Sequence, residues 1–363
     1  MVEALVSDRI AEPQRARTLG ALRGVEAGKG GDAGTPSKPG GHHRSLIRWR
    51  NIALRRVVLP VIFPTNGGER VLDHEWKNLI ILDDCRVDAF SKAWREFGFK
   101  GTLRECVTRG TDTRSFLLEN FAGAYHSDVV YVTANPNVST VVPDRFFKII
   151  PVWRNGWNDE YDTVLPETMY EYALDASRRF PDKRLIIHFL QPHIPFIDLP
   201  EDARNSFRVL PDVLRKPQAN ASKTSSDTES PFSVYLPPWD SNWYLFELSL
   251  GNERIRELYQ RNLSHALPYV KKLLDELPGK SVVTSDHGEA IGEPLHPLIP
   301  FRVYGHPPGV RMKCLTRVPW FVSVPSTQGP HGPPDLPAHG DETEHEVDDE
   351  KVVEERLRSL GYV

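Results

Sequence analysis

The sequence predicts an α/β protein in which helices flank a doubly wound, mostly parallel sheet, and two observations lead to this fold class. Short apolar runs rich in β-branched residues recur along the chain, as expected of strands buried on both faces of a sheet. The segments between these runs carry apolar residues at helical spacing, and alternating strands and helices are typical of doubly wound sheets. The predicted strands cover residues 78–83, 128–134, 184–190, 281–286 and 319–324.

Two segments between these runs carry clear helix signals. Residues 166–180 begin with a proline, which suits the first turn of a helix. Residues 252–277 carry apolar side chains at helical spacing, namely Ile255, Leu258, Leu263, Leu267, Val270 and Leu274. We therefore expect a helix in each segment.

Length and composition exclude several classes of protein. A chain of 363 residues is long enough for one large domain or two smaller ones with a sizeable core. Hydrophobic residues make up 39% and charged residues 26% of the sequence. No apolar run approaches the roughly 18 residues of a membrane span, and the mean hydropathy is -0.42. Collagen, coiled coils and integral membrane proteins are thereby excluded.

The cysteines and the N-terminus bear on the compartment. Three cysteines at wide spacing form neither a disulfide framework nor a CxxC pair. The N-terminus lacks the basic segment, apolar core and small-residue cleavage site of a secretory signal. We therefore expect a reducing, cytoplasmic location.

Charge and low-complexity segments divide the chain into three parts. Residues 1–60 hold 11 Lys/Arg against 5 Asp/Glu and are expected to form a basic, partly disordered extension. Residues 61–324 form the main, catalytic domain, and the polar stretch 205–240 within it is an insertion or lid near the active site. Residues 325–363 form an acidic linker and a C-terminal helix.

Residues 44–63 interleave arginines with large apolar side chains. This pattern suits peripheral contact with an anionic membrane or an acidic partner. The alternative is a first helix or strand that packs on the domain with its arginines outward. A nucleic-acid partner is not expected, because the pI is about 6.4 and the body of the chain lacks a stripe of aromatic and basic residues.

Metal-ligand residue types follow three of the predicted strands. Asp84 lies just after the first strand, Asp286 and His287 close the fourth, and His193 follows the third. In an open α/β sheet the carboxyl ends of the strands meet at one edge, where ligands bind. Carboxylate and imidazole together favour Zn²⁺ or Mn²⁺ over Ca²⁺. The alternative is that these residues only cap a helix or polarise a turn.

The turn at residues 108–114 contains the hydroxyls Thr111 and Thr113 ahead of an amphipathic segment. Such a hydroxyl can cap a helix or, beside a metal ion, act as a nucleophile. Two further side chains have structural interpretations at this stage. His188 is expected to be a satisfied core histidine inside its strand, and Arg86 is expected to pair with Asp88 at a helix start.

In the order of its motifs the chain resembles the alkaline phosphatase superfamily, which includes sulfatases, nucleotide pyrophosphatases and lipoteichoic acid synthases. The resemblance spans about residues 78–324, and the SDHGE strand end is its most specific part. It rests on DDCRVDAF (83–90), GTDTRSFLLENF (110–121), IIHFLQPHIPF (186–196), VVTSDHGEAIGE (282–293), and YGHPP (304–308) ahead of RVPWFV (317–322).

The resemblance implies roles for single residues. Asp84, Asp286, His287, His306 and Thr111 would be metal ligands, and Thr111 would also be the nucleophile, since an aromatic residue follows it at the fifth position. His193 would act in catalysis and contact the substrate. Arg114, in the nucleophile's turn, would bind the substrate. One divalent ion, Zn or Mn, is implied. A second ion stays open because the aspartate and histidine pair that holds it in pyrophosphatase-type members has no clean counterpart in residues 186–196.

The function implied is that of a metal-dependent hydrolase or transferase of phosphoesters that works through a covalent phosphothreonine. Sulfate esters are less favoured, because the chain lacks the Cys/Ser-x-Pro-x-Arg motif of formylglycine sulfatases. The expected partner is a phosphorylated or sulfated small molecule, glycan or lipid head group. The alternative is a non-catalytic module of the same fold that serves as a scaffold at a membrane or glycan-assembly complex.

Overall fold

A computed structural model describes residues 67–201, 241–296, 299–324 and 349–360 of the chain. The predicted basic extension, the predicted membrane-contact segment 44–63, the insertion 205–240 and the acidic part of the C-terminal linker lie outside these residues. Within the described residues, no helix is both long enough and apolar enough to cross a membrane.

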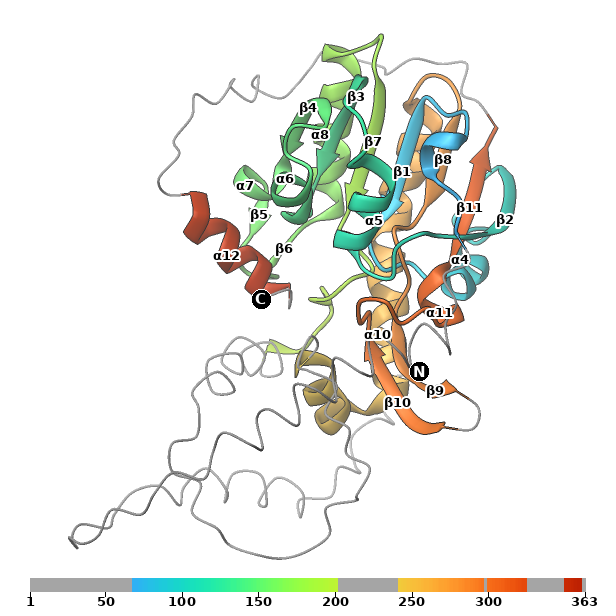
Figure 1. Ribbon diagram of the computed structural model, residues 1–363, viewed down its shortest axis with the longest axis vertical. Helices are drawn as coiled ribbons and strands as arrows, with labels where there is room; N and C mark the ends of the chain where they lie inside the picture. Colours follow the sequence, from blue (N-terminus) through green and yellow to red (C-terminus); the bar gives the residue numbers. More distant parts are fainter. Residues whose placement is uncertain (1–66, 202–240, 297–298, 325–348, 361–363) are drawn as a thin grey trace, which may run out of the picture. The chain divides into compact units, whose positions relative to one another are not determined.

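A seven-stranded mixed sheet forms the centre of the fold, in the order β2-β11-β8-β1-β7-β3-β4 (Figure 1). Five neighbouring strands, from β8 to β4, run parallel to one another. The sheet strands are β1 (Asn78–Leu82), β2 (Gly101–Val107), β3 (His126–Thr133), β4 (Phe146–Pro151), β7 (Arg184–Phe189), β8 (Ser281–Thr284) and β11 (Arg317–Ser323). This arrangement confirms the predicted α/β class with a mostly parallel sheet.

One predicted parallel strand has the opposite direction. Strand β11 pairs antiparallel with β8 on one side and with β2 on the other. Its run of apolar residues correctly indicated burial, since Val318 to Phe321 are buried. Burial on both faces does not reveal strand direction, however, because direction depends on the connection that leads into the strand.

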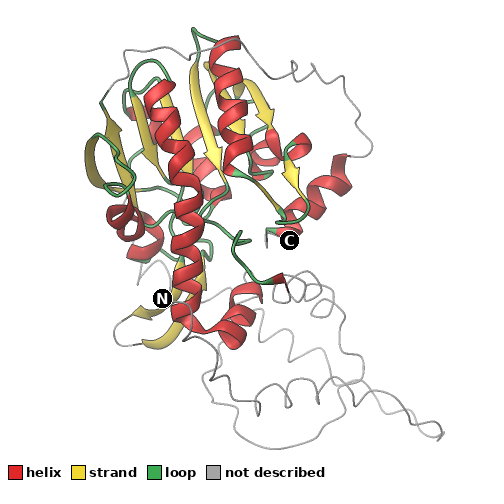
Figure 2. Cartoon of the chain, turned by 180° about the vertical axis from the view of Figure 1, so that it is seen from behind, coloured by secondary structure: helices red, strands yellow, loops and turns green. Residues whose placement is uncertain are grey.

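Helices cover both faces of the sheet, because alternate side chains of each strand point to opposite faces. On one face, Ile80 and Leu82 share a core with the helices α4, α8 and α10. On the other, Leu79 and Ile81 share a core with α5 and α6. Figure 2 shows α8 and the long α10 lying across the first face. The helices are η2 (Val71–Asp73), α4 (Val87–Ala93), α5 (Thr113–Phe121), α6 (Asn137–Val141), α7 (Val152–Asn155), α8 (Pro166–Arg179), α10 (Ser241–Glu276), α11 (Lys313–Thr316) and α12 (Asp349–Ser359).

Helix α10 consists of two helical stretches joined at a kink. Gly251 has φ 73° and ψ 156°, a backbone conformation that side chains with a Cβ rarely adopt. The stretch after this glycine corresponds to the predicted helix 252–277, and its Ile255, Leu258 and Leu263 are fully buried. Helix α8 likewise begins at the predicted Pro166.

Two short antiparallel pairs lie outside the central sheet. The β9 (Ala290–His296) and β10 (Ile299–Gly305) hairpin connects the end of β8 to the segment that carries His306. The smaller pair is β5 (Trp157–Asn158) with β6 (Thr163–Val164). The hairpin matters for function, because both of its ends enter the candidate site described next.

Candidate metal centre

The ends of β1 and β8 bring four metal-ligand side chains together. These strands are parallel neighbours, with Ile81 opposite Thr284, so the residues that follow each strand emerge at the same edge. They are Asp83 and Asp84 after β1, and Asp286 and His287 after β8, and all four are fully buried.

The backbone at Asp84 has a conformation that is unusual for aspartate. Its φ is 67°, in the left-handed region that costs residues with a Cβ some energy. Its N–H donates to Oδ1 of Asp286 at 3.2 Å, and its carbonyl accepts from the Tyr259 hydroxyl at 2.6 Å. These two hydrogen bonds from distant segments hold the turn in this conformation.

The turn after β8 is equally constrained. The amide of Cys85 donates to the Ser285 hydroxyl at 2.8 Å, which ties the two strand ends together. Gly288 donates its N–H to the Leu315 carbonyl at 2.8 Å, and a Cβ at this position would lie 2.1 Å from the carbonyl oxygen of Cys314. Only glycine fits such a close backbone approach, so the SDHGE motif requires its glycine for packing.

Asp84, His287 and His306 form a first ligand triad, in which each residue offers one ligand atom and these atoms lie within 4.8 Å of one another. The His287 Nδ1 atom is 2.7 Å from Asp84 Oδ1, and the His306 Nδ1 atom is 3.3 Å from the same oxygen. The ring centroids of the two histidines are 4.6 Å apart. The structure thus brings three of the sequence-predicted ligands together.

Asp83, His188 and Asp286 form a second triad by the same measure. His188 Nε2 lies 3.7 Å from Asp83 Oδ2 and 3.9 Å from Asp286 Oδ2. The prediction of His188 as a satisfied core histidine is therefore wrong in one respect. The ring is buried in the sheet as expected, but one nitrogen faces the carboxylates, because His188 lies opposite Ile81 in the register of β7 with β1, close to the ends of both strands.

The structure places Thr113, and not Thr111, against the two triads. The Thr113 hydroxyl lies 2.9 Å from Asp286 Oδ2 and 3.2 Å from His287 Nε2. The Thr111 hydroxyl instead accepts from the Gly309 amide at 2.9 Å and lies 3.3 Å from Asp112 Oδ2. Thr113 is thus the hydroxyl nearest to the triads, and the assignment of Thr111 as ligand and nucleophile stays a prediction.

The reason for this difference is the helix start. Asp112 is the N-cap of α5 and forms a reciprocal capping box with Ser115. Thr113 is consequently the first residue of the helix and faces the strand ends, whereas Thr111 lies before the cap. Sequence spacing allowed either threonine, because it did not reveal which aspartate or hydroxyl would cap the helix.

His193 lies at the edge of the first triad, whereas Arg114 is an exposed residue. The His193 Nε2 atom is 3.5 Å from Asp84 Oδ2, and its ring centroid is 5.3 Å from that of His306. Arg114 is exposed at the second position of α5. Its role in substrate binding stays a prediction.

Three residues outside the predicted site, Asp83, Asn135 and Glu289, complete the buried cluster. The Oε2 atom of Glu289 lies 3.1 Å from His306 Nδ1, within hydrogen-bond distance. Asn135, after β3, donates to Asp83 Oδ2 at 2.5 Å. The signal for Glu289 was its place in SDHGE, and for Asp83 it was the acidic doublet DD; Asn135 carried no signal, since it follows a different strand.

Burial and charge shift the acid–base equilibria of the cluster in opposite directions. Burial, together with neighbouring carboxylates, holds the pKa of Asp83 and of Asp84 well above the usual range. Burial lowers the pKa of His188 to about 4 and, with the charge of His306, that of His193 to about 3. Although burial opposes it, the carboxylates of Asp84 and Glu289 raise the pKa of His306 to about 10.

The donor set fits a divalent cation. Neither carboxylate oxygen of Asp84 accepts a well-aligned hydrogen bond from the described residues, and His188 Nε2 likewise has no hydrogen-bond partner among them. Buried polar atoms of this kind are costly unless something compensates them. A cation that binds carboxylate oxygen and imidazole nitrogen would compensate both, and Zn²⁺ and Mn²⁺ accept this mixture.

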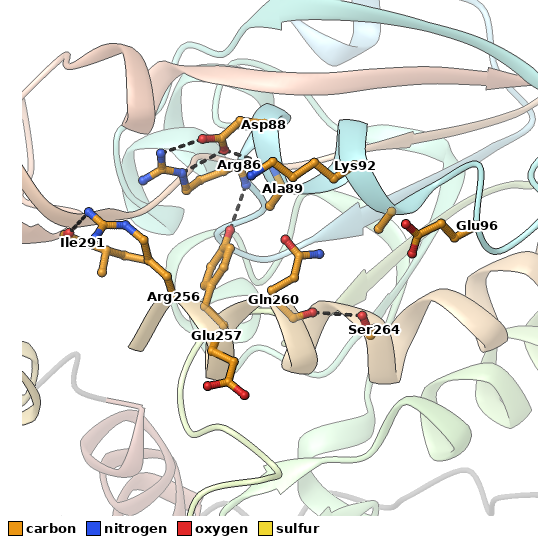
Figure 3. Close-up of a pocket in the computed structure, with 12 residues that line it drawn as sticks. Arg86, Asp88, Ala89, Lys92, Glu96, Arg256, Glu257, Gln260, Ser264 and Ile291 are labelled. Atoms are coloured by element: carbon orange, nitrogen blue, oxygen red, sulfur yellow. Dashed lines mark hydrogen bonds and ion pairs between the residues drawn. The ribbon is translucent and has the colours of Figure 1, made fainter. Parts of the chain in front are cut away.

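A cavity of about 520 Å³ lies beside the cluster, between α4 and α10 (Figure 3). Its lining includes Arg86, Asp88 and Arg256, and none of the triad residues. Arg86 Nη2 is 2.8 Å from Asp88 Oδ2, which confirms the predicted pair, and Arg86 Nη1 is 2.6 Å from Glu293 Oε1. The charges of this cavity therefore neutralise one another.

Comparisons with known proteins give matches among solved structures alone. No protein-family model matches the chain, and no curated protein matches it. One match is the C-terminal periplasmic domain of EcEptC from Escherichia coli in complex with Zn, at 15% identity and a TM-score of 0.35, covering 72% of this chain and 76% of that chain. Another is a protein in the alkaline phosphatase superfamily from Vibrio parahaemolyticus, at 13% identity and a TM-score of 0.34, covering 78% of this chain and 70% of that chain.

Proposed function

We propose that the chain is a metal-dependent enzyme of the alkaline phosphatase superfamily that transfers a phosphoryl group from a phosphoester to water or to another alcohol. The observation that carries the proposal is the position of the Thr113 hydroxyl. It lies 2.9 Å from Asp286 Oδ2 and 3.2 Å from His287 Nε2, inside a buried cluster of carboxylates and imidazoles. A hydroxyl at a helix start needs no such surroundings to act as a cap, and the cap of α5 is supplied by Asp112.

Asp84, His287 and His306 are the residues that would hold a divalent ion, with Zn²⁺ or Mn²⁺ as the proposed metal. When bound, such an ion neutralises charge on the phosphoryl oxygens and lowers the pKa of a nearby hydroxyl.

The protein's own groups would then act on the phosphoryl group as follows. The Thr113 oxygen forms a bond to phosphorus while the bond from phosphorus to the leaving oxygen breaks, and the hydroxyl proton ends on the leaving oxygen, which departs as an alcohol. The result is a phosphothreonine at the amino end of α5. In the second step water or an acceptor alcohol attacks the same phosphorus and the bond from phosphorus to the Thr113 oxygen breaks. The proton of the attacking group then restores the Thr113 hydroxyl.

His193 would contact the substrate in this scheme. Burial keeps its pKa low, at about 3, so its ring is neutral at pH 7 and can donate a hydrogen bond from a nitrogen without carrying charge. The proposed substrate is a phosphorylated small molecule, glycan or lipid head group. Phosphoesters are favoured over sulfate esters because the formylglycine motif is missing from the sequence.

The test compares the two threonines of one turn. Thr113→Ala and Thr111→Ala are assayed in the full chain with chromogenic phosphomonoesters and phosphodiesters, each with Zn²⁺ and with Mn²⁺. Removal of a nucleophile costs roughly 10⁴-fold or more in kcat, so we expect that loss for Thr113→Ala with the metal content unchanged. Thr111→Ala should stay within about tenfold, because its hydroxyl bonds to the Gly309 amide and to Asp112 Oδ2 and not to the buried cluster.

Mass spectrometry of quenched reactions adds an independent readout. A phosphoryl group on the peptide that contains Thr113 supports the proposal. If Thr111→Ala loses activity instead and Thr113→Ala does not, the nucleophile is the residue that the sequence resemblance indicated. A parent protein that binds no divalent ion contradicts the proposal as a whole.

A further inference from the structure

Helix α10 carries two buried polar side chains that the proposed mechanism does not use. They are Tyr259 and Asn262, and residues three apart on a helix lie on the same face. Leu258 and Leu263, which flank them along the chain, are buried in the apolar core. A polar side chain that is buried in such a helix needs hydrogen-bond partners, so the partners of these two residues indicate what the face does.

The Tyr259 hydroxyl bridges the turn that follows β1. It donates to the carbonyl of Asp84 at 2.6 Å and accepts the N–H of Arg86 at 2.9 Å. The hydroxyl therefore holds the backbone on both sides of one turn, in which Asp84 has its left-handed φ of 67°. The direction of the Asp84 carboxylate depends on this backbone conformation.

Asn262 holds the segment that contains His193 in a similar way. Its Nδ2 atom donates to the carbonyls of Pro192, at 3.2 Å, and of His193, at 2.9 Å. Its Oδ1 atom accepts the N–H of Ile197 at 3.1 Å. Both donors and the acceptor of the amide are thus used on one short segment. This segment also contains Pro195, and prolines supply no N–H for backbone hydrogen bonds of their own.

The two segments meet at the first triad. The His193 Nε2 atom is 3.5 Å from Asp84 Oδ2, and the His193 amide donates to the Asp83 carbonyl at 3.2 Å. Because one face of α10 anchors both segments, the helix sets the spacing between the carboxylate and the imidazole. Loss of either anchor would allow one of these groups to move while the apolar contacts of the helix remain.

We propose that Tyr259 and Asn262 are positioning residues of the centre, with Tyr259 acting on the proposed ligand Asp84 and Asn262 on the proposed substrate contact His193. This inference rests on the proposed function, because it assigns supporting residues to the same centre. Residues that orient a metal ligand typically contribute roughly 10- to 100-fold to metal affinity or activity. The two residues should differ in what they affect, since they hold different groups.

The first test compares two tyrosines of α10 by the same substitution. The full chain is stripped with a chelator and titrated with Zn²⁺ against a chromophoric chelator. Tyr259→Phe should bind Zn²⁺ about 10-fold more weakly than the parent, and with Co²⁺ its visible absorption should change as Asp84 shifts. Tyr269→Phe, whose ring packs with Tyr170, should match the parent in both measurements.

The second test compares two buried asparagines, with inorganic phosphate as the probe. Asn262→Ala should bind phosphate about 10-fold more weakly in calorimetric titration of the Zn²⁺-loaded protein, with Zn²⁺ affinity close to that of the parent. Asn78→Ala is the control, because Asn78 Nδ2 also donates two hydrogen bonds, to Pro278 and Ser281, at the opposite end of β1. Both variants should lose stability towards urea, but Asn78→Ala should bind phosphate as the parent does.

A conservative variant keeps this test valid if Asn262→Ala does not fold. Asn262→Gln retains the amide but moves it by one methylene. Its groups can still bond to the backbone, whereas His193 would be displaced. Phosphate binding should therefore be weaker than in the parent.

The outcomes are distinguishable. A parent that binds no Zn²⁺ contradicts both this inference and the proposed function, and a parent that binds Zn²⁺ but no phosphate contradicts the proposed substrate class and the role of Asn262. If the parent binds both, equal Zn²⁺ affinity and Co²⁺ spectrum in Tyr259→Phe and Tyr269→Phe overturn the role of Tyr259 alone. Equal phosphate affinity in the Asn262 variants and Asn78→Ala overturns the role of Asn262 alone.

Discussion

The buried cluster at the ends of β1 and β8 and the cavity between α4 and α10 both gather charged side chains, but they compensate them differently. In the cavity, Arg86 contacts Asp88 and Glu293 directly, so cation and anion are paired within the protein. In the cluster, Asp84 Oδ1 contacts only the ring nitrogens of His287 and His306, which are metal-ligand atoms themselves, and the Nε2 atom of His188 is buried without a hydrogen-bond partner among the described residues. The cavity could hold a ligand by its volume, whereas the cluster contains buried ligand atoms that are not fully hydrogen-bonded. Such atoms are the better indication of an ion site.

The largest expected effect is a loss of ion affinity when a carboxylate of the cluster is removed, compared with removal of a carboxylate of the cavity. Loss of a residue that hydrogen-bonds to a metal ligand weakens ion binding by roughly 10- to 100-fold. Asp84 is a proposed ligand itself, so Asp84→Asn should weaken binding of the ion by more than that. Asp88→Asn, at a partly exposed ion pair of the cavity, should leave ion affinity unchanged. Both are measured by titration with Zn²⁺ against a competing chelator. Equal losses in the two variants would show that the charge of the whole region, and not the geometry of the cluster, attracts the ion.

In the ion-free protein, Asp84→Asn is expected to affect the free energy of unfolding in the opposite direction. Burial raises the pKa of Asp84 in the folded state, so its ionised form costs stability as the pH rises above the unfolded value of 3.8 towards the folded value. At pH 7 Asp84→Asn should therefore keep or increase the free energy of unfolding of the stripped protein, measured by urea denaturation. A clear decrease would mean that this carboxylate stabilises the fold without an ion.

A smaller effect, on stability, is expected from the turn that positions the cluster. Gly288→Ala would place a Cβ 2.1 Å from the Cys314 carbonyl oxygen, so we expect a loss of roughly 2–4 kcal/mol in unfolding free energy. Gly123→Ala, in the turn after α5 where a Cβ would meet nothing within 4 Å, should change it by less than about 1 kcal/mol. Urea denaturation of both variants gives the comparison, and similar values for the two would show that the β8 turn can relax.

The smallest expected effect is the release of protons when the ion binds. The pKa of His306 is raised to about 10 by Asp84 and Glu289, against the opposing effect of burial, so its ring carries a proton at pH 7 in the ion-free protein. A metal ligand must give up that proton, and uptake of the ion should release on the order of one proton. Calorimetric titration in two buffers with different ionisation enthalpies measures this number, and affinity should rise with pH. Binding without proton release would argue against His306 as a ligand.

Several parts of the fold and site could be predicted because their signals are local. The apolar runs of β1, β3, β7 and β8 are long enough to identify buried strands, and Pro166 marks the start of α8 correctly. Asp84, Asp286 and His287 lie at strand ends, and strand ends converge in this class of fold. Their convergence followed from the sequence once the sheet was assumed.

Other parts depended on contacts between distant segments. The direction of β11 is decided by its pairing with β2 and β8, and no residue within the strand encodes it. Thr113 lies nearer to the cluster than Thr111 because Asp112 and Ser115 cap α5. His188 reads as one more buried residue in an apolar strand until the register with β1 places it beside Asp83 and Asp286.

The sequence by itself therefore determined the α/β class, most of the parallel strands and the residue types of the candidate metal centre, because hydrophobic periodicity and the positions after strands are properties of neighbouring residues. Only the tertiary structure decided which hydroxyl faces the centre and that two triads lie side by side. The physical reason is that these depend on strand register and on a helix cap, where a shift of one or two residues points a side chain in another direction.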